Sequence, residues 1–277
     1  LDDLKIRFGY GVTGNNDFSA TYMANMLGSD TNWMMPNGTW AYSYGKSQNV
    51  NPNLGWEEKK EWNLGVDYSF FEGRLYGKFD YYRREVDNLL FSVKVPQPPY
   101  TQGSQMQNIG SMESKGWEFE VGGDIIRTKD FTWSSSMNLS HNTGKILTLE
   151  GDNSYHNGNG FVAPGTPGDA ARMEAGSTIG SFYMWKFAGF DDEGSFLLYN
   201  KDGEVIPAAQ KTENDKQYIG NYTPKLIIGW SHTLTYKNFD LGINLRSWID
   251  FDVYNTINMY YGIQGQGNLN VVKDAYG

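Results

Sequence analysis

Residues 108–131, NIGSMESKGWEFEVGGDIIRTKDF, decide the fold because their second half alternates between apolar and polar side chains. Within 117–125, WEFEVGGDI, every second residue is apolar or glycine, and the residues between them are acidic or glycine. A β-strand sends successive side chains to opposite faces, so this run predicts a strand with one apolar and one wet face. The chain reverses over 127–130 and alternates again from Phe131, which predicts a long hairpin with a very short turn.

The same alternation recurs along the whole chain. We expect seven long strands of this kind, over residues 4–12, 60–71, 74–94, 117–125, 131–145, 225–236 and 239–249. One face of these runs carries no Asp, Glu, Lys or Arg over its regular part. The opposite face carries the charges, namely Lys5, Arg7, Glu61, Asp67, Lys78, Asp80, Glu118, Glu120, Asp124, Asp240 and Arg246. A charge on the lipid side of a membrane barrel costs about 2 to 4 kcal/mol at mid-depth, so membrane-spanning strands require such an uncharged face.

Connections of two lengths alternate between these strands. Short turns fall at 72–73, 128–130 and 237–238, and long connections at 14–55, 95–111 and 146–222. Outer-membrane barrels have this asymmetry, with short periplasmic turns and long extracellular loops. The sequence therefore favours an all-β fold, an antiparallel up-and-down transmembrane β-barrel segment with long extracellular loops.

The strand count bears on the domain organisation. The strand at 131–145 leaves a short turn and the strand at 225–236 leads to one, so an even number of crossings lies between them. We expect 150–222 to form a long extracellular excursion with a hairpin over 180–206, rather than two more spanning strands. Seven crossings do not close a barrel, and open edges in lipid would leave backbone groups unpaired. We therefore expect residues 1–277 to be a partial barrel wall, incomplete at both ends.

Composition and charge limit the classes of function. The 277 residues are 16% aromatic and include 33 glycines, which favours strands and turns over helices. A formal net charge of -9 without a basic stripe argues against nucleic acid as a partner. Cysteine is absent, so there is neither a disulfide framework nor a thiolate metal site.

Motifs typical of enzymes are weak in this chain. Residues 9–14, GYGVTG, fit a dinucleotide fingerprint, but Lys5 and Arg7 interrupt the strand before them, and glycines of a barrel strand explain the match better. Glu118 and Glu120 share a face, which a solvated lumen wall explains better than a glycosidase pair. The isolated histidines are His141, His156 and His232. They have no partners at metal-ligand spacing, so we expect no enzyme activity, no catalytic residue and no cofactor.

Calcium in the outer loops is the one alternative to a chain without metal. Residues 191–193 (DDE) and 200–204 (NKDGE) offer oxygen ligands, although neither run has the spacing of an EF-hand loop. The pair Asp202 and Gly203 is by itself a signal for a hairpin turn.

Aromatic residues gather in the long connections. Trp33, Trp40, Tyr42 and Tyr44 lie among Asn and Gly in the first connection, and Tyr155 lies in a later one. Aromatic faces beside amide groups suit the recognition of sugars or peptides. The alternative is that these rings pack the loops against one another. We take these five residues as the candidate substrate-binding residues.

Several segments together resemble one protein family. They are NPNLGWEEKKEWNLGVDYSFFEGRLYGKFDYYRREVDNLL (51–90), NIGSMESKGWEFEV (108–121), KDFTWSSSMNLSHNTGKI (129–146), IGSFYMWKFAGF (179–190) and NYTPKLIIGWSHTLTYKNFDLGINL (221–245). In order and spacing they are similar to the C-terminal barrel half of SusC/RagA-type TonB-dependent transporters.

The resemblance implies a function that the residues alone do not give. Such proteins are outer-membrane barrels of about 22 strands with a plug inside. They import glycans or peptides with energy delivered through TonB, and a SusD-like surface lipoprotein caps them as a lid. The resemblance implies that this chain is barrel wall and external loops in the cell outer membrane, in contact with lipid, while TonB acts through an N-terminal part. It also implies that the five loop aromatics contact the oligosaccharide or peptide substrate, or the lid.

Two other classes fit parts of the pattern. A soluble all-β carbohydrate-binding module would place the apolar faces in a sandwich core. A polysaccharide-cleaving all-β enzyme would need a convergent acid pair, which the sequence lacks. Lipid contact at Trp62, Val66, Phe119 and Ile228 is what the barrel predicts, whereas a dry interior around them would favour the sandwich.

Overall fold

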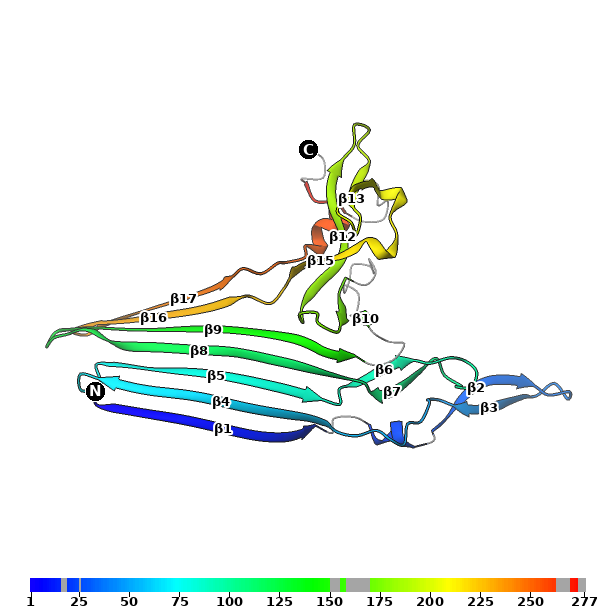
Figure 1. The fold of residues 1–277 in the computed structure, drawn as a ribbon, viewed down its shortest axis with the longest axis horizontal. Helices are drawn as coiled ribbons and strands as arrows, with labels where there is room; N and C mark the ends of the chain where they lie inside the picture. Colours follow the sequence, from blue (N-terminus) through cyan, green and yellow to red (C-terminus); the bar gives the residue numbers. More distant parts are fainter. Residues whose placement is uncertain (16–18, 25, 150–154, 158–169, 263–269, 274–277) are drawn as a thin grey trace.

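The long sheet dominates the molecule. The computed structural model describes residues 1–15, 19–24, 26–149, 155–157, 170–262 and 270–273. Seven strands form one antiparallel sheet in the order β1-β4-β5-β8-β9-β16-β17 (Figure 1). They are β1 (Asp3–Asn15), β4 (Glu57–Phe70), β5 (Leu75–Asp87), β8 (Gly110–Arg127), β9 (Phe131–Leu149), β16 (Leu226–Tyr236) and β17 (Phe239–Ile249). The predicted all-β, up-and-down arrangement of seven long strands is confirmed.

Short turns join the long strands at one end of the sheet, on the left of Figure 1. Between β4 and β5 the backbone turns over Phe71, Glu72 and Gly73, whose φ angles are 60°, 57° and 79°. Residues with positive φ reverse the chain within very few positions, because their backbone twist matches the right-handed twist of the two flanking strands. Between β8 and β9 the amide of Phe131 donates to the hydroxyl of Thr128 at 3.1 Å.

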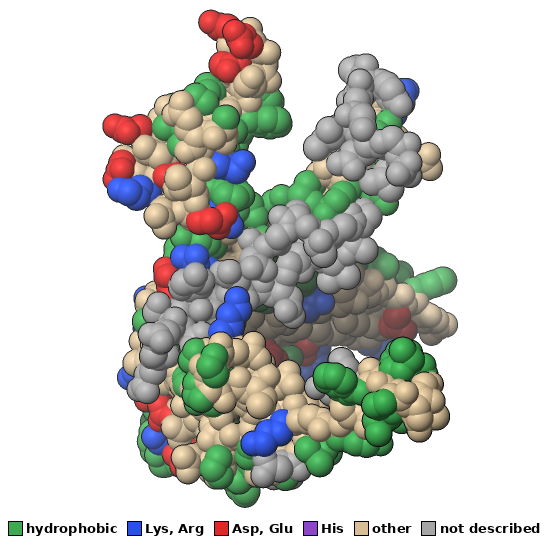
Figure 2. Space-filling view, turned by 90° about the vertical axis from the view of Figure 1, so that its right-hand side faces the viewer, with side chains coloured by type: hydrophobic (Ala, Val, Ile, Leu, Met, Phe, Trp, Pro, Cys, Tyr) green, Lys and Arg blue, Asp and Glu red, His purple; other side chains and the backbone are tan. Residues whose placement is uncertain are grey.

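Smaller elements gather at the other end of the sheet, which faces the viewer in Figure 2. They are η1 (Ala20–Met23), β2 (Leu27–Met34) paired with β3 (Trp40–Lys46), β6 (Leu90–Lys94) paired with β7 (Ser104–Asn108), β10 (Tyr155–Asn157) paired with β11 (Arg172–Glu174), η2 (Ala208–Gln210), η3 (Glu213–Asp215) and α1 (Thr256–Tyr261). A further sheet has the order β14-β13-β12-β15, from β12 (Ser181–Phe190), β13 (Phe196–Tyr199), β14 (Val205–Pro207) and β15 (Lys216–Asn221). No helix in the described ranges has the length and apolar character needed to cross a membrane.

The region 180–206 contributes no strand to the long sheet. β9 pairs directly with β16, from Phe131 opposite Tyr236 to Ser140 opposite Ile227. The described residues between them build the separate four-stranded sheet, which stands away from the long strands in Figure 1. Its position outside a membrane stays a prediction.

The predicted strand over 74–94 is wrong in one respect, because the structure divides it in two. Asn88 adopts φ 58°, so β5 ends at Asp87 and β6 begins at Leu90 in a different sheet. Asparagine tolerates this left-handed conformation better than most residues. The carbonyl of Asn88 accepts a hydrogen bond from the Asn108 side chain at 2.8 Å, which fixes the bend.

The register of the central hairpin shifts twice, once between Ser111 and Met112 and once near the short turn. The register between β8 and β9 shifts between Asp124 and Ile126, so Ile125 is an extra residue without a cross-strand partner. A bulge of this kind bends the strand and increases its twist. Strict alternation over 117–125 therefore ends one residue before the sequence predicted.

The apolar face of the long sheet is not covered by a second layer in the described part of the chain. One rung across six strands consists of Ile6, Val66, Phe79, Phe119, Leu139 and Ile228. None of these side chains is buried, and Ile6 and Phe79 remain 70% and 40% exposed. The buried apolar residues are instead Leu54, Tyr82, Leu89, Val93, Ile109, Ile146 and Ala170. A sandwich core, which the soluble alternative requires, is therefore not what these faces form.

Candidate functional site

The polar face of the long sheet carries charges that alternate in sign from strand to strand. One rung runs through Lys5, Asp67, Lys78, Glu120, Asn138, Gly229 and Arg246. Directly opposite residues of an antiparallel pair share a face and interact, and opposite charges there stabilise the pairing by a few tenths of a kcal/mol to about 1 kcal/mol. Lys78 Nζ lies 3.0 Å from Glu120 Oε2. This face is therefore strongly polar, while its charges largely offset one another.

Arg7 ties three strands together across this face. Its guanidinium donates to both carboxylate oxygens of Asp67, at 2.9 and 2.8 Å, and to Asp80 on β5 at 3.0 Å. The side chain crosses β4 at Gly65, where an added Cβ would lie 2.7 Å from the guanidinium and 2.5 Å from Asp80. Only glycine at this position leaves room for the Arg7 side chain to reach from β1 across β4 to Asp80 on β5.

The first long connection contains an aromatic hairpin, β2–β3, rather than an irregular loop. Trp40, Tyr42 and Tyr44 occupy one face of β3, because they alternate with Ala41 and Ser43. Their exposures of 65%, 70% and 69% leave the rings open to solvent. Three exposed aromatic side chains on one face of a strand offer a surface on which sugar rings or apolar peptide side chains can stack.

Trp33 is separated from those three rings. It lies opposite Ala41 in the β2–β3 register, so it projects from the other face of the hairpin, where it is also exposed. The structure therefore brings three of the candidate residues together and leaves Trp33 apart. Tyr155 lies in β10, opposite Glu174 of β11, and its side chain falls outside the described part of the structure.

Side-chain amides hold the base of the aromatic hairpin. The buried side chain of Asn49 donates to the carbonyls of Gln102 and Ser104 at 2.6 and 2.8 Å. Its oxygen accepts from the amide and hydroxyl of Thr101 and from the amide of Gln102, each at 3.2 Å. The Asn49 side chain thus provides hydrogen-bond partners for backbone groups of residues 101–104, and it joins the two adjacent loops.

Further amides extend this contact along the two loops. The side chain of Gln102 donates to the Lys46 carbonyl at 2.7 Å, directly after β3. Asn108 accepts from the amide of Gly55 at 2.8 Å and donates to its carbonyl at 2.9 Å. We call the segments 46–55 and 101–108 the amide clasp. It fixes the aromatic hairpin to the connection between β6 and β7.

The acidic runs considered for calcium form turns. One oxygen of Asp191 accepts from the amides of Glu193 and Ser195, at 3.0 and 2.7 Å. The side-chain oxygen of Asn200 accepts in the same way from Asp202 and Glu204, at 3.0 and 2.8 Å. Within the described residues there is no group of three or more acidic or histidine side chains that would hold a metal ion.

Asp215 anchors the turn before β15 in the four-stranded sheet β14-β13-β12-β15, which we call the outer sheet because it stands away from the long strands. Its carboxylate accepts from the hydroxyl and amide of Thr212, at 2.7 and 2.8 Å, and from the amide of Lys201 at 3.2 Å. The Thr212 hydroxyl, with these two amides, holds the pKa of the Asp215 carboxyl below its usual range. In the same sheet, burial and the neighbouring Glu174 carboxylate raise the pKa of Tyr218 to about 12. These groups support the outer sheet and show no pairing typical of acid–base catalysis.

The weak enzyme motifs are explained by the fold. Gly9 and Gly11 lie inside β1, which pairs antiparallel with β4 and is not part of a parallel βαβ unit. His232 accepts a hydrogen bond from the indole of Trp133 at 3.3 Å, and the His141 ring bonds to the Lys225 carbonyl. Both rings thus have structural partners on the sheet.

Sequence reasoning missed the amide clasp and the Arg7 bridge. A signal for the clasp exists in the density of Asn and Gln over 48–53 and 97–108. The signal does not say which amide meets which loop, because the contacts join residues about 50 positions apart. The Arg7 bridge depends on the pairing register of β1, β4 and β5, which the alternation of apolar and polar residues does not determine.

Comparison of the chain with known proteins identifies a family with this architecture. Residues 1–270 match the family model described as TonB dependent receptor-like, beta-barrel. TonB-dependent receptor SusC of Bacteroides thetaiotaomicron is 32% identical over 266 residues, which are 92% of this chain and 26% of that protein. TonB-dependent receptor P26 of Formosa agariphila is 30% identical over 272 residues, or 91% of this chain and 26% of that protein. The chain thus spans about a quarter of the length of these curated relatives.

Solved structures agree with the sequence matches. The RagAB peptide importer in its open-open state superposes with a TM-score of 0.79 and 25% identity, over 96% of this chain and 28% of that one. The RagAB peptide transporter gives a TM-score of 0.73 and 26% identity, over 88% of this chain and 26% of that one. With its uncovered apolar face and its meander of long strands, the chain belongs to the TonB-dependent receptor family, within the β-barrel of that family.

Proposed function

We propose that this chain is barrel wall of a SusC-like, TonB-dependent transporter in the outer membrane. The observation that carries the proposal is the contrast between neighbouring rungs of one sheet. The rung through Lys5 and Glu120 is polar, whereas the next rung, through Ile6 and Phe119, is apolar and open. A single layer with these two faces fits between hydrocarbon and a watery lumen.

Aromatic residues border the apolar band on both sides, as they do where a barrel meets the membrane surfaces. Toward the long connections the border consists of Tyr10, Trp62, Tyr81, Trp117 and His141, which are cross-strand or diagonal neighbours. Toward the short turns it consists of Tyr68, Phe70, Trp133 and Tyr236. Trp62 and Phe70 are about 26 Å apart along the strand at ~3.3 Å per residue, or roughly 20 Å across a membrane after a tilt of ~40°. That height is close to the ~25 Å of an outer-membrane apolar band.

In this orientation the long connections face the exterior and take part in substrate capture. The excursion over 150–222 is extracellular, and the face of Trp40, Tyr42 and Tyr44 contacts the imported molecule or its lid. Stacking aromatics favour glycans, while the similarity to a peptide importer favours peptides. A SusD-like lipoprotein closes the outer opening, and TonB supplies energy through a part of the transporter other than this wall.

Alanine substitution on the two faces of the hairpin tests the assignment. Trp40→Ala and Tyr44→Ala should each weaken binding by about tenfold, because each removes roughly 1 to 2 kcal/mol of stacking. Trp33→Ala, on the opposite face, is the matched control and should leave affinity within about twofold. The measurement is isothermal titration of the complete transporter with candidate oligosaccharides and oligopeptides. Assembly is monitored by the heat-dependent mobility of the folded barrel. Equal affinities for all three variants and the wild type would refute the role of this surface.

A further inference from the structure

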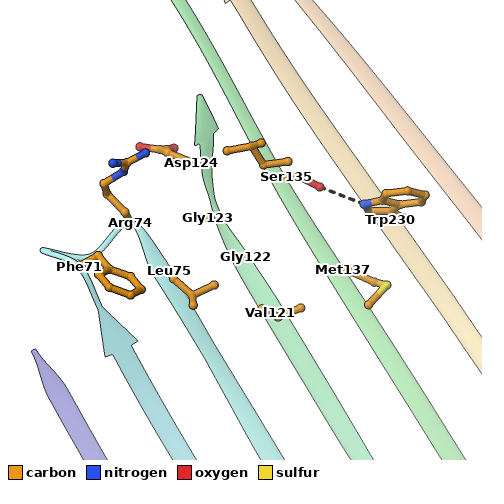
Figure 3. Close-up of a pocket in the computed structure, with 11 residues that line it drawn as sticks. Phe71, Arg74, Leu75, Val121, Gly122, Gly123, Asp124, Ser135, Met137 and Trp230 are labelled. Atoms are coloured by element: carbon orange, nitrogen blue, oxygen red, sulfur yellow. Dashed lines mark hydrogen bonds between the residues drawn. The ribbon is translucent and has the colours of Figure 1, made fainter. Parts of the chain in front are cut away.

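The outer sheet exposes aromatic side chains that a membrane does not explain. On the long sheet the apolar face contacts hydrocarbon in the proposed orientation, and this includes the groove lined by Leu75, Val121, Met137 and Trp230 (Figure 3). The outer sheet instead stands away from the long strands, in a connection that faces the exterior in that orientation (Figure 1). Exposed rings on the outer sheet therefore need a partner other than lipid.

Three phenylalanines, which we call the phenylalanine patch, carry this exposed surface. Phe187 and Phe190 of β12 and Phe196 of β13 contact one another, with ring centroids 5.0 to 6.0 Å apart. They nevertheless remain 52%, 59% and 57% exposed. An aromatic side chain buries roughly 150 to 250 Å² when it is fully enclosed, so the three rings leave on the order of 300 Å² of apolar surface open. A contiguous patch of this size often marks an interaction site.

A β-bulge brings the three rings to one face of the outer sheet. Residues 187 and 190 are three positions apart, so a regular strand would send their side chains to opposite faces. The register between β12 and β13 shifts between Phe187 and Gly189, which leaves Ala188 without a cross-strand partner and places Phe190 directly opposite Phe196. Gly189 adopts φ 130°, a conformation that residues with a Cβ rarely take. The bulge thus re-aims Phe190 and gathers the patch.

An acidic turn adjoins the phenylalanine patch. It joins β12 to β13 and carries Asp191, Asp192 and Glu193. One oxygen of Asp191 accepts amides of the turn, while Asp192 and Glu193 are exposed. Lys201, in the turn at the other end of β13, is paired with Asp202 at 2.8 Å. Figure 2 shows acidic side chains at the top of the molecule, with hydrophobic side chains beside them.

The other lysines of the described outer sheet do not offset the charge of the acidic turn. Lys186 projects from the face opposite the patch, with its ammonium 5.1 Å from the Tyr199 ring. Lys211 and Lys216 lie over the ring of Trp185, at 5.0 and 4.4 Å. Trp185 precedes the acidic turn by six positions, or roughly 17 to 20 Å of strand, which exceeds the screening length of ~8 Å at physiological salt. The patch is therefore apolar with a negative border.

We propose that the phenylalanine patch and the acidic turn dock the SusD-like lipoprotein lid, through an apolar recess edged by Lys or Arg side chains. The inference rests on the proposed function, which places the lid on the exterior side, where the outer sheet stands. Charge complementarity favours this occupant, because three carboxylates attract a basic rim and repel an anionic membrane surface. Phenylalanine rings also lack the polar atom with which a tyrosine orients a sugar. The surface is a protein contact, separate from substrate capture.

Binding of the lipoprotein to the complete receptor tests this surface. The receptor is held in lipid nanodiscs, and the SusD-like lipoprotein isolated with it is supplied without its lipid anchor in surface plasmon resonance. Phe190→Ser combined with Phe196→Ser should weaken the affinity at least about tenfold, because buried aromatic anchors dominate the energetics of an interface. Val205→Ser is the matched control, since Val205 is 52% exposed on the opposite face of the same sheet and its loss should change affinity less than about twofold.

A charge reversal separates the acidic turn from the rings. Asp192→Lys combined with Glu193→Lys should slow association severalfold and weaken its dependence on salt, because charges at the rim of an interface mainly steer the encounter. Asp202→Lys combined with Glu204→Lys makes the same charge change at the other end of β13 and should associate as the wild type does. The acidic-turn variant removes no ring contact, so it carries the test should the phenylalanine variant fold poorly.

Several outcomes would overturn the proposal. Unchanged lid affinity in the folded phenylalanine variant, or an equal loss in Val205→Ser, would do so. A phenylalanine variant that keeps the lid but loses affinity for substrate, measured without the lipoprotein, would assign the patch to substrate capture instead. A wild-type receptor that binds no SusD-like lipoprotein would contradict the proposed function itself, and this inference with it.

Discussion

Asn49→Ala should open the amide clasp and release the aromatic hairpin. Asn49 is 7% exposed, and its side chain makes five hydrogen bonds to Thr101, Gln102 and Ser104. Each such bond contributes about 1 kcal/mol net, and a buried group left without a partner costs about 1 to 3 kcal/mol. The bonds converge on one side chain, so their contributions do not add. We expect a loss of roughly 2 to 3 kcal/mol in the free energy of local opening.

Hydrogen exchange measures this opening directly. The amides of Thr101 and Gln102 donate to the Asn49 oxygen, so their exchange should accelerate by roughly 30- to 150-fold. The matched control is Asn53→Ala, the same change on an exposed side chain in the same loop. Substrate affinity should fall with Asn49→Ala, since the aromatic face loses its fixed position. Unchanged exchange at both amides, or equal acceleration in Asn53→Ala, would refute the reasoning.

Three further predictions concern the long sheet and the outer sheet. Gly65→Leu should displace the Arg7 guanidinium and lower the free energy of unfolding of the barrel in urea by roughly 1 to 3 kcal/mol. Gly9→Leu is the control at an open position of β1, and it should change that free energy by less than ~0.5 kcal/mol. Val66→Arg should cost about 2 to 4 kcal/mol of barrel stability in lipid, and Asn63→Arg on the polar face should cost much less. The pKa of Asp215 is depressed in the folded state, so its carboxylate stabilises the outer sheet above the usual Asp pKa, and this contribution disappears as the pH falls through the lowered value. The protection factor of the Lys201 amide, which is its intrinsic exchange rate divided by the observed rate, should therefore fall at acid pH in the wild type, and Asp215→Asn should remove that pH dependence.

The alternation predicted most of the long sheet because its physical cause is local. A strand with lipid on one side must place apolar side chains at every second position, and runs such as 60–71 show this directly. The turn at Glu72 and Gly73 was equally visible. The bend at Asn88 was not visible in the sequence, because it depends on a hydrogen bond from Asn108, which lies 20 positions later. The bulge at Ile125 likewise depends on the partner strand.

The candidate site was predicted in part. Trp40, Tyr42 and Tyr44 alternate with small residues and follow Asn37 and Gly38, which is a hairpin signal that sequence reasoning overlooked. Their common face follows from that hairpin. The separation of Trp33 depends on the β2–β3 register, which the sequence does not specify.

Collision accessibility of spin labels tests the central claim most directly. The 277 residues contain no cysteine, so single cysteines introduced at Val66, Phe119 and Asn138 are each the one labelling site within this part of the receptor, and a parent without these substitutions measures the background from the rest. In the complete receptor in lipid bilayers, labels at Val66 and Phe119 should collide more with oxygen, which dissolves in hydrocarbon, than with a water-soluble nickel chelate. The label at Asn138 should show the reverse. Labels at Val66 and Phe119 that meet neither reagent would mean that these side chains lie in a dry protein interior, and the membrane-wall account would be contradicted.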